Sequence, residues 1–127
     1  MTPIIFINSK NTPFVDQILS GRKRYETRTR NTLRQFIGHR VLLAETGNGR
    51  PVVRCTAVIT EVIEVISQWE WIHTYRKHTG IRSGSRYDWQ PDTKVKYLYR
   101  LAGVVACHPF TPPEDIRHGR VWMEYNA

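Results

Sequence analysis

A short motif near the N-terminus gathers side chains that can bind or transform an anion. Lys23, Glu26 and Arg28 follow Gly21 in the pattern Gly-x-Lys-x-x-Glu-x-Arg. A lysine can hold a phosphate, and it can act as a base or nucleophile if neighbouring cations lower its pKa. A carboxylate can move a proton, or accept a hydrogen bond from a base amino group such as that of cytosine. The motif therefore predicts a nucleotide-binding site, with catalysis as the alternative.

The charge of the chain favours a polyanionic partner. The 127 residues include 19 Lys and Arg against 11 Asp and Glu, a formal net charge of +8, and 14 of the basic residues are Arg. The segment 22–34 alone has six basic residues and one acid. Arginine side chains fit phosphates and guanine edges, and they stack on bases. RNA or a nucleotide is the expected partner, with single-stranded DNA as a second candidate and a merely solvated basic face as the alternative.

A short helix is predicted directly before this motif. Thr12 followed by Pro13 predicts a capped helix start, and the apolar positions that follow lie on one face of a short helix over 13–20. Gly21 is suited to end it. The motif therefore begins where the helix stops.

A strand must then present the motif's side chains. The alternation of Tyr, Thr, Glu and Arg over 25–30 favours a strand. Side chains alternate along a strand, so four charged residues fall on one face and three uncharged ones on the other. The charged face would hold Arg24, Glu26, Arg28 and Arg30.

The rest of the chain predicts a small α+β domain. A capping box at Ser67 and Glu70 opens a second helix through about Lys77. Residues 80–94 have turn chemistry, and loops of that length in compact domains are usually functional or mobile. Strands and helices do not alternate regularly along the chain. We therefore expect one α+β domain over 1–127, with a mixed or mostly antiparallel, barrel-like sheet of five to seven strands and two short helices. The other strands are expected at 4–8, 40–46, 52–65, 96–101, 103–107 and 120–125.

Aromatic side chains offer two further roles. Tyr25, Tyr87 and Trp89 could stack on a base, although a loop Trp more often covers the core. Trp71 and Tyr75 share a helix face and, with Trp69, are expected in the core, with a protein-binding patch as the alternative.

The motif and its surroundings resemble the ASCH domain family of the PUA-like superfamily. The resemblance rests on Gly21, Lys23, Glu26 and Arg28, and also on two later segments, one that follows Gly38 and one that precedes Cys107. It spans about residues 4–107. It implies a PUA-like β-barrel with flanking helices, a cleft beside the motif, and RNA binding. Some members are amidohydrolases of acetylated cytidine, in which a Lys, a Thr and a later Glu carry the chemistry, and others are reported as ribonucleases. Lys23 matches that Lys, Glu26 stands at the Thr position, and the later Glu has no clear counterpart.

Together these observations predict an RNA- or modified-nucleotide-binding module with a basic cleft. If it is also an enzyme, which the sequence leaves undecided, it would be a metal-independent amidohydrolase or ribonuclease. No cofactor, metal site or membrane span is expected, Cys55 and Cys107 are expected to be buried reduced thiols, and the location is expected to be cytoplasmic. Catalytic candidates are Lys23, Glu26 and Tyr97, the last as a proton donor. Candidates for binding nucleic acid are Arg22, Lys23, Arg24, Tyr25, Glu26, Arg28, Arg30, Arg82, Arg86, Trp89 and Lys94.

Overall fold

A strongly curved mixed sheet forms the body of the molecule. The structure is a computed structural model that describes residues 2–112 and 122–125, and within them six strands pair in the order β2-β5-β4-β3-β1-β6. β1 and β3 are parallel, and every other neighbouring pair is antiparallel. The strands are β1 Thr2–Asn8, β2 Tyr25–Arg28, β3 Arg40–Thr46, β4 Val52–Val65, β5 Lys96–Phe110 and β6 Trp122–Tyr125.

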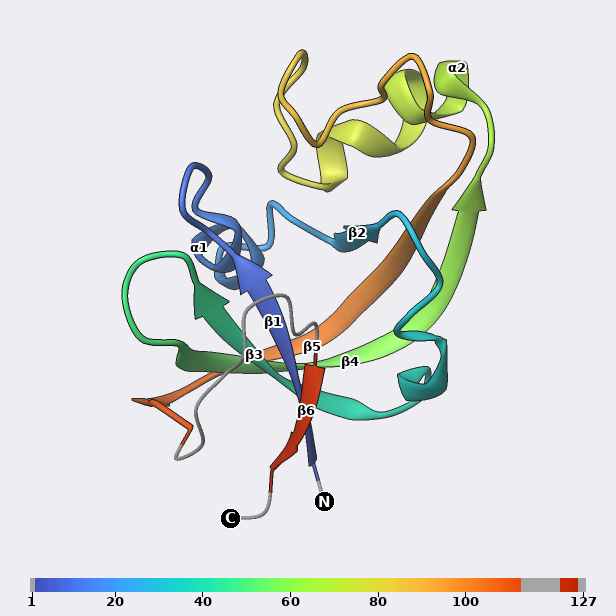
Figure 1. Ribbon diagram of the computed structural model, residues 1–127. Helices are drawn as coiled ribbons and strands as arrows, with labels where there is room; N and C mark the ends of the chain where they lie inside the picture. The colour runs from blue at the N-terminus through green and yellow to red at the C-terminus, as the bar shows by residue number, and fades with distance from the viewer. Residues whose placement is uncertain (1, 113–121, 126–127) are drawn as a thin grey trace.

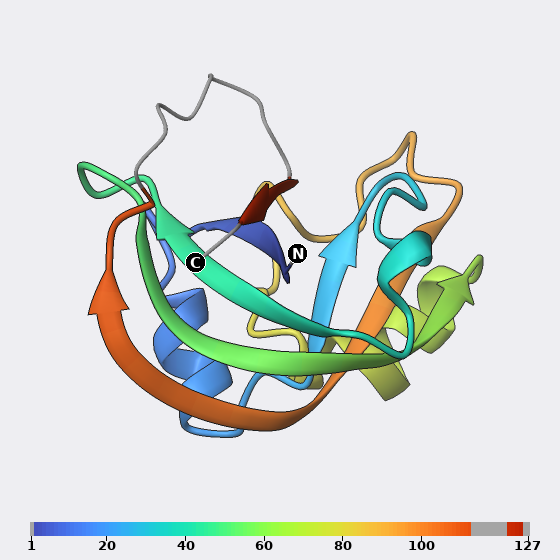
Figure 2. The same cartoon turned by 90° about the horizontal axis from the view of Figure 1, so that it is seen from below.

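The curvature of the sheet makes a half-barrel that is open between its two edge strands. β4 and β5 run as long arcs around the other strands (Figure 2). β2 pairs only with β5, and β6 only with β1, so the two edges do not close. The small, barrel-like α+β domain with five to seven mixed strands expected from the sequence is therefore confirmed, and its sheet forms an open half-barrel.

The core lies on the inner face of this half-barrel. The apolar run Ile4–Ile7 of β1 is buried, and β4 alternates buried and partly exposed residues along its first half, as a strand covered on one face should. Helix α1 (Phe14–Leu19) packs Phe14, Val15 and Ile18 into the same core. This packing fixes the position from which the chain turns into β2.

Two expected strands prove to be one. Residues 96–101 and 103–107 belong to the single strand β5, which continues to Phe110. Gly103 has φ +57°, and the register opposite β4 shifts there by one residue. A glycine with positive φ at an extra residue is the usual basis of a β-bulge, so the strand bends instead of ending.

The second helix differs more from its prediction. Ser67 does cap it, since its Oγ accepts from the Glu70 backbone N–H at 3.3 Å. The segment then changes its winding, from α2 (Gln68–Glu70) through a π-helical turn η2 (Trp71–Tyr75) to a 3₁₀ turn η3 (Arg76–His78). Figure 1 shows this helical segment lying beyond β2, next to the loop that leads into β5.

Several smaller expectations are corrected. Pro13 itself occupies the N-cap position of α1 and no side chain caps it, so the Thr12 hydroxyl does not act as predicted. β2 ends at Arg28 rather than at residue 30. A further short 3₁₀ turn, η1, spans Arg34–Phe36. The expected last strand is seen as β6, while its first residues, 120 and 121, lie outside the described residues.

Both cysteines are free thiols, but only one is buried. Cys55 is fully buried, whereas Cys107 is partly exposed. Burial raises the pKa of the Cys55 thiol to about 11, so it stays protonated at neutral pH. In the part of the chain described, no helix is long and apolar enough to cross a membrane.

Candidate functional site

A cavity of about 1080 Å³ opens beside the motif, between the end of β1, strand β2, the β3–β4 hairpin and the loop before β5. Its size lies at the upper end of the range typical of small-molecule sites. Apolar residues such as Phe14 and Ile81 line it together with charged ones. The charged residues in its lining are Lys23, Glu26, Arg28, Arg86, Asp88, Asp92, Lys94 and Lys96.

Lys23 is a buried ammonium group whose three N–H bonds all meet acceptors. Its side chain leaves the turn after α1, and the residue is only 2% exposed. The Nζ atom donates to the carbonyl oxygens of Tyr25 at 2.8 Å and Thr79 at 2.7 Å, and it lies 3.3 Å from Glu26 Oε1. Burial lowers the pKa of Lys23, and the Glu26 carboxylate opposes that effect. The lysine therefore ties β2 to the end of the helical segment.

Glu26 and Arg28 lie side by side on β2, as strand alternation predicts. Arg28 Nη2 lies 2.8 Å from Glu26 Oε2 and donates to the Phe6 carbonyl at 2.9 Å. Glu26 thus sits between two cations, Lys23 and Arg28, each bound to one of its oxygens. The Nε of Arg28 is buried and has no partner among the described residues.

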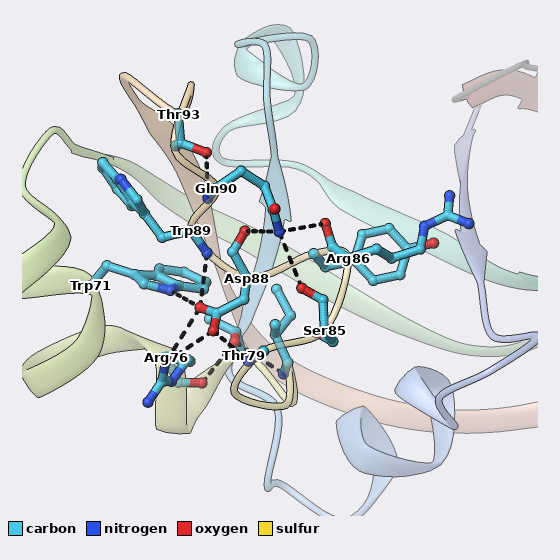
Figure 3. A network of polar contacts seen from close by, with 12 residues as sticks. Trp71, Arg76, Thr79, Ser85, Arg86, Asp88, Trp89, Gln90 and Thr93 are labelled. Atoms are coloured by element: carbon cyan, nitrogen blue, oxygen red, sulfur yellow. Dashed lines mark hydrogen bonds and ion pairs between the residues drawn. The ribbon is translucent and has the colours of Figure 1, made fainter.

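The loop that forms the opposite wall is held by Asp88 (Figure 3). Its carboxylate accepts from Trp71 Nε1 at 2.6 Å, from the backbone N–H groups of Gly84 at 2.7 Å and Trp89 at 2.8 Å, and from Arg76 at 3.1 Å. Burial alone would raise the pKa of Asp88, but these donors and the Arg76 charge together lower it to about 2. Asp88 is therefore a structural carboxylate.

Gln90 extends this network along the loop. Its side-chain amide donates to the backbone carbonyls of Ser85, Arg86 and Asp88, and its backbone N–H donates to Thr93 Oγ1 (Figure 3). These contacts give a segment without regular secondary structure a defined shape.

Lys96, the first residue of β5, is a second buried lysine in the lining. It is 5% exposed, donates to the Tyr87 carbonyl at 2.8 Å, and lies 4.8 Å from the centre of the Trp71 ring. Burial lowers the pKa of Lys96, and the Asp88 carboxylate opposes that effect. Unlike Lys23, it has a single hydrogen-bond acceptor among the described residues.

An aromatic wall completes the cavity. The rings of Phe14 and Tyr87 meet edge to face at 5.9 Å between centroids. The Arg86 guanidinium lies 4.8 Å from the centre of the Tyr87 ring. Rings and cations in such an arrangement are suited to contact bases and phosphates.

The structure brings together six of the residues that the sequence singled out. Lining this cavity are Lys23, Glu26, Arg28, Arg86, Tyr87 and Lys94.

The other candidates lie outside that lining. Tyr25 packs edge to face on Tyr75, and Trp89 and Tyr97 pack against the core. The remaining four, Arg22, Arg24, Arg30 and Arg82, are exposed cations elsewhere on the surface. Trp71 is fully buried and Tyr75 packs against the core, as expected, but Trp69 is 66% exposed.

Sequence reasoning missed Lys96 and Asp88. Asp88 lies within the loop before β5 and Lys96 directly follows that loop, and both are buried, which nothing in their sequence neighbourhood indicates. The only available signal was the length of loop 80–94, which marked the segment but not these residues.

A half-barrel of this topology with a cavity beside its N-terminal helix defines a PUA-like domain. The family model described as "ASCH domain" matches residues 9–112, most of the chain. The chain therefore belongs to the ASCH domain family, a PUA-like group generally associated with RNA binding.

Solved structures agree on the fold. The ASCH protein of Zymomonas mobilis matches with TM-score 0.77 at 15% identity, over 98% of this chain and 87% of that one. A tyrosine-to-phenylalanine mutant of that protein matches with TM-score 0.77 and a serine-to-alanine mutant with 0.76, each at 15% identity over 98% of this chain, and over 90% and 88% of theirs. No curated protein matches.

Proposed function

We propose that this domain binds RNA, or a modified nucleotide, with one nucleotide in the cavity beside the motif. The observation that carries the proposal is the lining itself, in which Arg86 and Lys94 are exposed cations at the rim of a cavity that is also lined by Lys23 from the turn before β2 and by Glu26 and Arg28 from β2. The rim cations are placed to hold phosphates, and the Phe14–Tyr87 wall is suited to contact a base.

Binding to phosphates makes affinity depend on salt. Each phosphate contact releases counterions, so the logarithm of the binding constant falls linearly with the logarithm of the salt concentration. We expect a fluorescein-labelled single-stranded RNA octamer to bind with an affinity that falls steeply between 50 and 200 mM salt. Affinity that does not change with salt would contradict the proposal.

A matched pair of variants tests the location. Arg86 and Arg82 are both exposed arginines of the same loop, but only Arg86 lines the cavity. Arg86→Gln is expected to weaken octamer binding at least about fivefold, as loss of one charged contact should. Arg82→Gln should change it less than about twofold. Equal losses from both variants would place the RNA on the loop surface instead of in the cavity.

One observation favours a hydrolase as the second candidate. Burial lowers the pKa of Lys23, which is what a lysine base or nucleophile requires. Its three N–H bonds are all engaged, however, so chemistry would need them to rearrange. The test is product analysis of acetylated cytidine and RNA after incubation with the protein and with Lys23→Ala. Equal turnover by both proteins, or no turnover by either, would remove this candidate.

A further inference from the structure

Two buried side chains that line the cavity have hydrogen-bond donors without acceptors. The Nε of Arg28 has no hydrogen-bond partner among the described residues, although Nη2 of the same guanidinium contacts Glu26 and the Phe6 carbonyl. The Lys96 ammonium has three N–H bonds but, within the part of the chain that the structure describes, donates only to the Tyr87 carbonyl. Leaving a buried hydrogen-bond donor without an acceptor costs free energy. Both side chains therefore favour a ligand that supplies an acceptor atom.

Two neighbours of Lys96 offset part of the cost of burying its ammonium group. The Trp71 ring lies 4.8 Å from its Nζ, and the Asp88 carboxylate attracts it. Asp88 does not meet its need for acceptors, because both carboxylate oxygens already accept from other groups.

The two buried carboxylates of the lining, Glu26 and Asp88, are in contrast already paired. Each Glu26 oxygen is bound to a cation, Lys23 or Arg28. Asp88 accepts from Trp71, Arg76 and two backbone groups. Among the described residues, the buried side-chain groups of the lining that still lack partners are therefore the donors of Arg28 and Lys96 and the Thr27 hydroxyl, which can donate or accept.

We propose that the cavity selects a nucleobase with a carbonyl-rich edge, uracil over cytosine, and that Lys96 and the Nε of Arg28 are the donors that contact it. This inference rests on the proposed nucleotide binding. Uracil carries a carbonyl oxygen where cytosine carries an amino group. The preference follows if one of these two donors faces position 4 of the ring, where it would meet the amino group of cytosine and leave both groups unpaired.

Phosphates are expected elsewhere in the same complex. Arg86 and Lys94 are exposed and can hold a phosphate in water, whereas Lys96 and Arg28 lie deeper, next to the carboxylates of Asp88 and Glu26. A buried phosphate would be repelled by those carboxylates, but a neutral carbonyl would not.

The test compares two RNAs that differ only in the base. Fluorescein-labelled octauridylate and octacytidylate have the same number of phosphates, so their ratio of affinities isolates the base contact. The wild-type protein is expected to prefer octauridylate about tenfold, as one well-placed hydrogen-bonded base contact gives. Lys96→Met should bring the ratio close to one, and Lys94→Met, its exposed control, should weaken both RNAs alike and leave the ratio unchanged.

A second variant keeps the inference testable if Lys96→Met does not fold. Arg28→Lys retains the positive charge beside Glu26 but removes the Nε donor, and it should also reduce the preference. A wild-type protein that binds both RNAs equally, or prefers octacytidylate, would overturn this inference and leave the proposed function standing. Preference retained in both variants would also overturn it. Failure of both RNAs to bind would overturn the proposed function as well.

Discussion

Glu26 shows why the motif residues are structural as well as functional candidates. Its carboxylate neutralises two buried or half-buried cations, Lys23 and Arg28, and it is itself only 8% exposed. Removing one member of such a cluster leaves the others buried without a partner, which costs much more than the cluster gains when it is complete.

Replacing Glu26 with Gln should therefore lower the free energy of unfolding strongly. We expect Glu26→Gln to destabilise the protein by about 3 kcal/mol, because Lys23 and Arg28 both lose the carboxylate with which they pair. The measurement is chemical unfolding in urea at neutral pH.

Glu61 provides the control. It pairs with Arg100 at 3.8 Å on the surface, with both side chains about half exposed. Glu61→Gln should change the free energy of unfolding by less than about 0.5 kcal/mol. Similar losses from the two variants would mean that the Glu26 cluster is effectively solvated.

Asp88 should make stability depend on pH in acid. Its pKa is about 2 in the folded protein, below its ordinary value of 3.8, so the unfolded chain takes up a proton first as the pH falls. The stabilisation is complete above about pH 4 and is lost as the pH falls towards 2, and it amounts to about 2 kcal/mol.

Urea unfolding between pH 2 and 6 checks this. Asp88→Asn should be less stable than the wild type at pH 6, and the difference should shrink as the pH approaches 2. A difference that stays constant over this range would show that Asp88 does not titrate in the expected window.

At the scale of elements, β5 depends on the bend at Gly103. The positive φ there allows one strand to pair with β2 at one end and with the far end of β4 at the other. A side chain at this position would be strained, and its Cβ would lie 3.1 Å from an Arg40 nitrogen.

Gly103→Ala is therefore expected to cost about 1 to 2 kcal/mol of unfolding free energy. Ala106→Ser, an exposed substitution in the same strand, should cost less than about 0.5 kcal/mol. Thermal unfolding of both variants measures the difference, and an unchanged melting temperature for Gly103→Ala would contradict the role assigned to the bend.

Elements with a strong local pattern could be predicted from the sequence, and those shaped by distant contacts could not. The apolar face of α1, the alternation in β2 and the β-branched, apolar residues of β4 are local signals, and they predicted the correct element types. The π turn at Trp71–Tyr75 has no such signal. Trp71 there is buried and bonded to Asp88, a contact that tertiary packing sets and helix propensity does not.

At the scale of the molecule, the curved sheet and its shared core predict one cooperative unit. α1, the helical segment and the sheet all contribute to one main hydrophobic cluster, from Ile5 to Leu101. We expect urea unfolding followed by tryptophan fluorescence, which reports on buried Trp71, and by far-ultraviolet circular dichroism to give the same midpoint. Two separate transitions would indicate that the loop and helical segment unfold independently of the sheet.

The location of the candidate site could be predicted, but not its full membership. Alternation placed Glu26 and Arg28 on one face, because both belong to one short strand. Arg24 was assigned to the same face, yet it lies before the strand begins and is exposed. Lys96 and Asp88 join the cavity through the folding of a long loop, and no periodicity in the sequence encodes that path.

The bond from Lys23 to the Thr79 carbonyl joins residues 56 positions apart. During synthesis the whole motif is therefore made long before Thr79, whose carbonyl oxygen accepts the hydrogen bond from the Lys23 ammonium group. A nascent chain that ends within the helical segment contains every motif residue and still has no finished pocket. The ability to take up a ligand should appear abruptly, when the ribosome has released the chain well past Thr79.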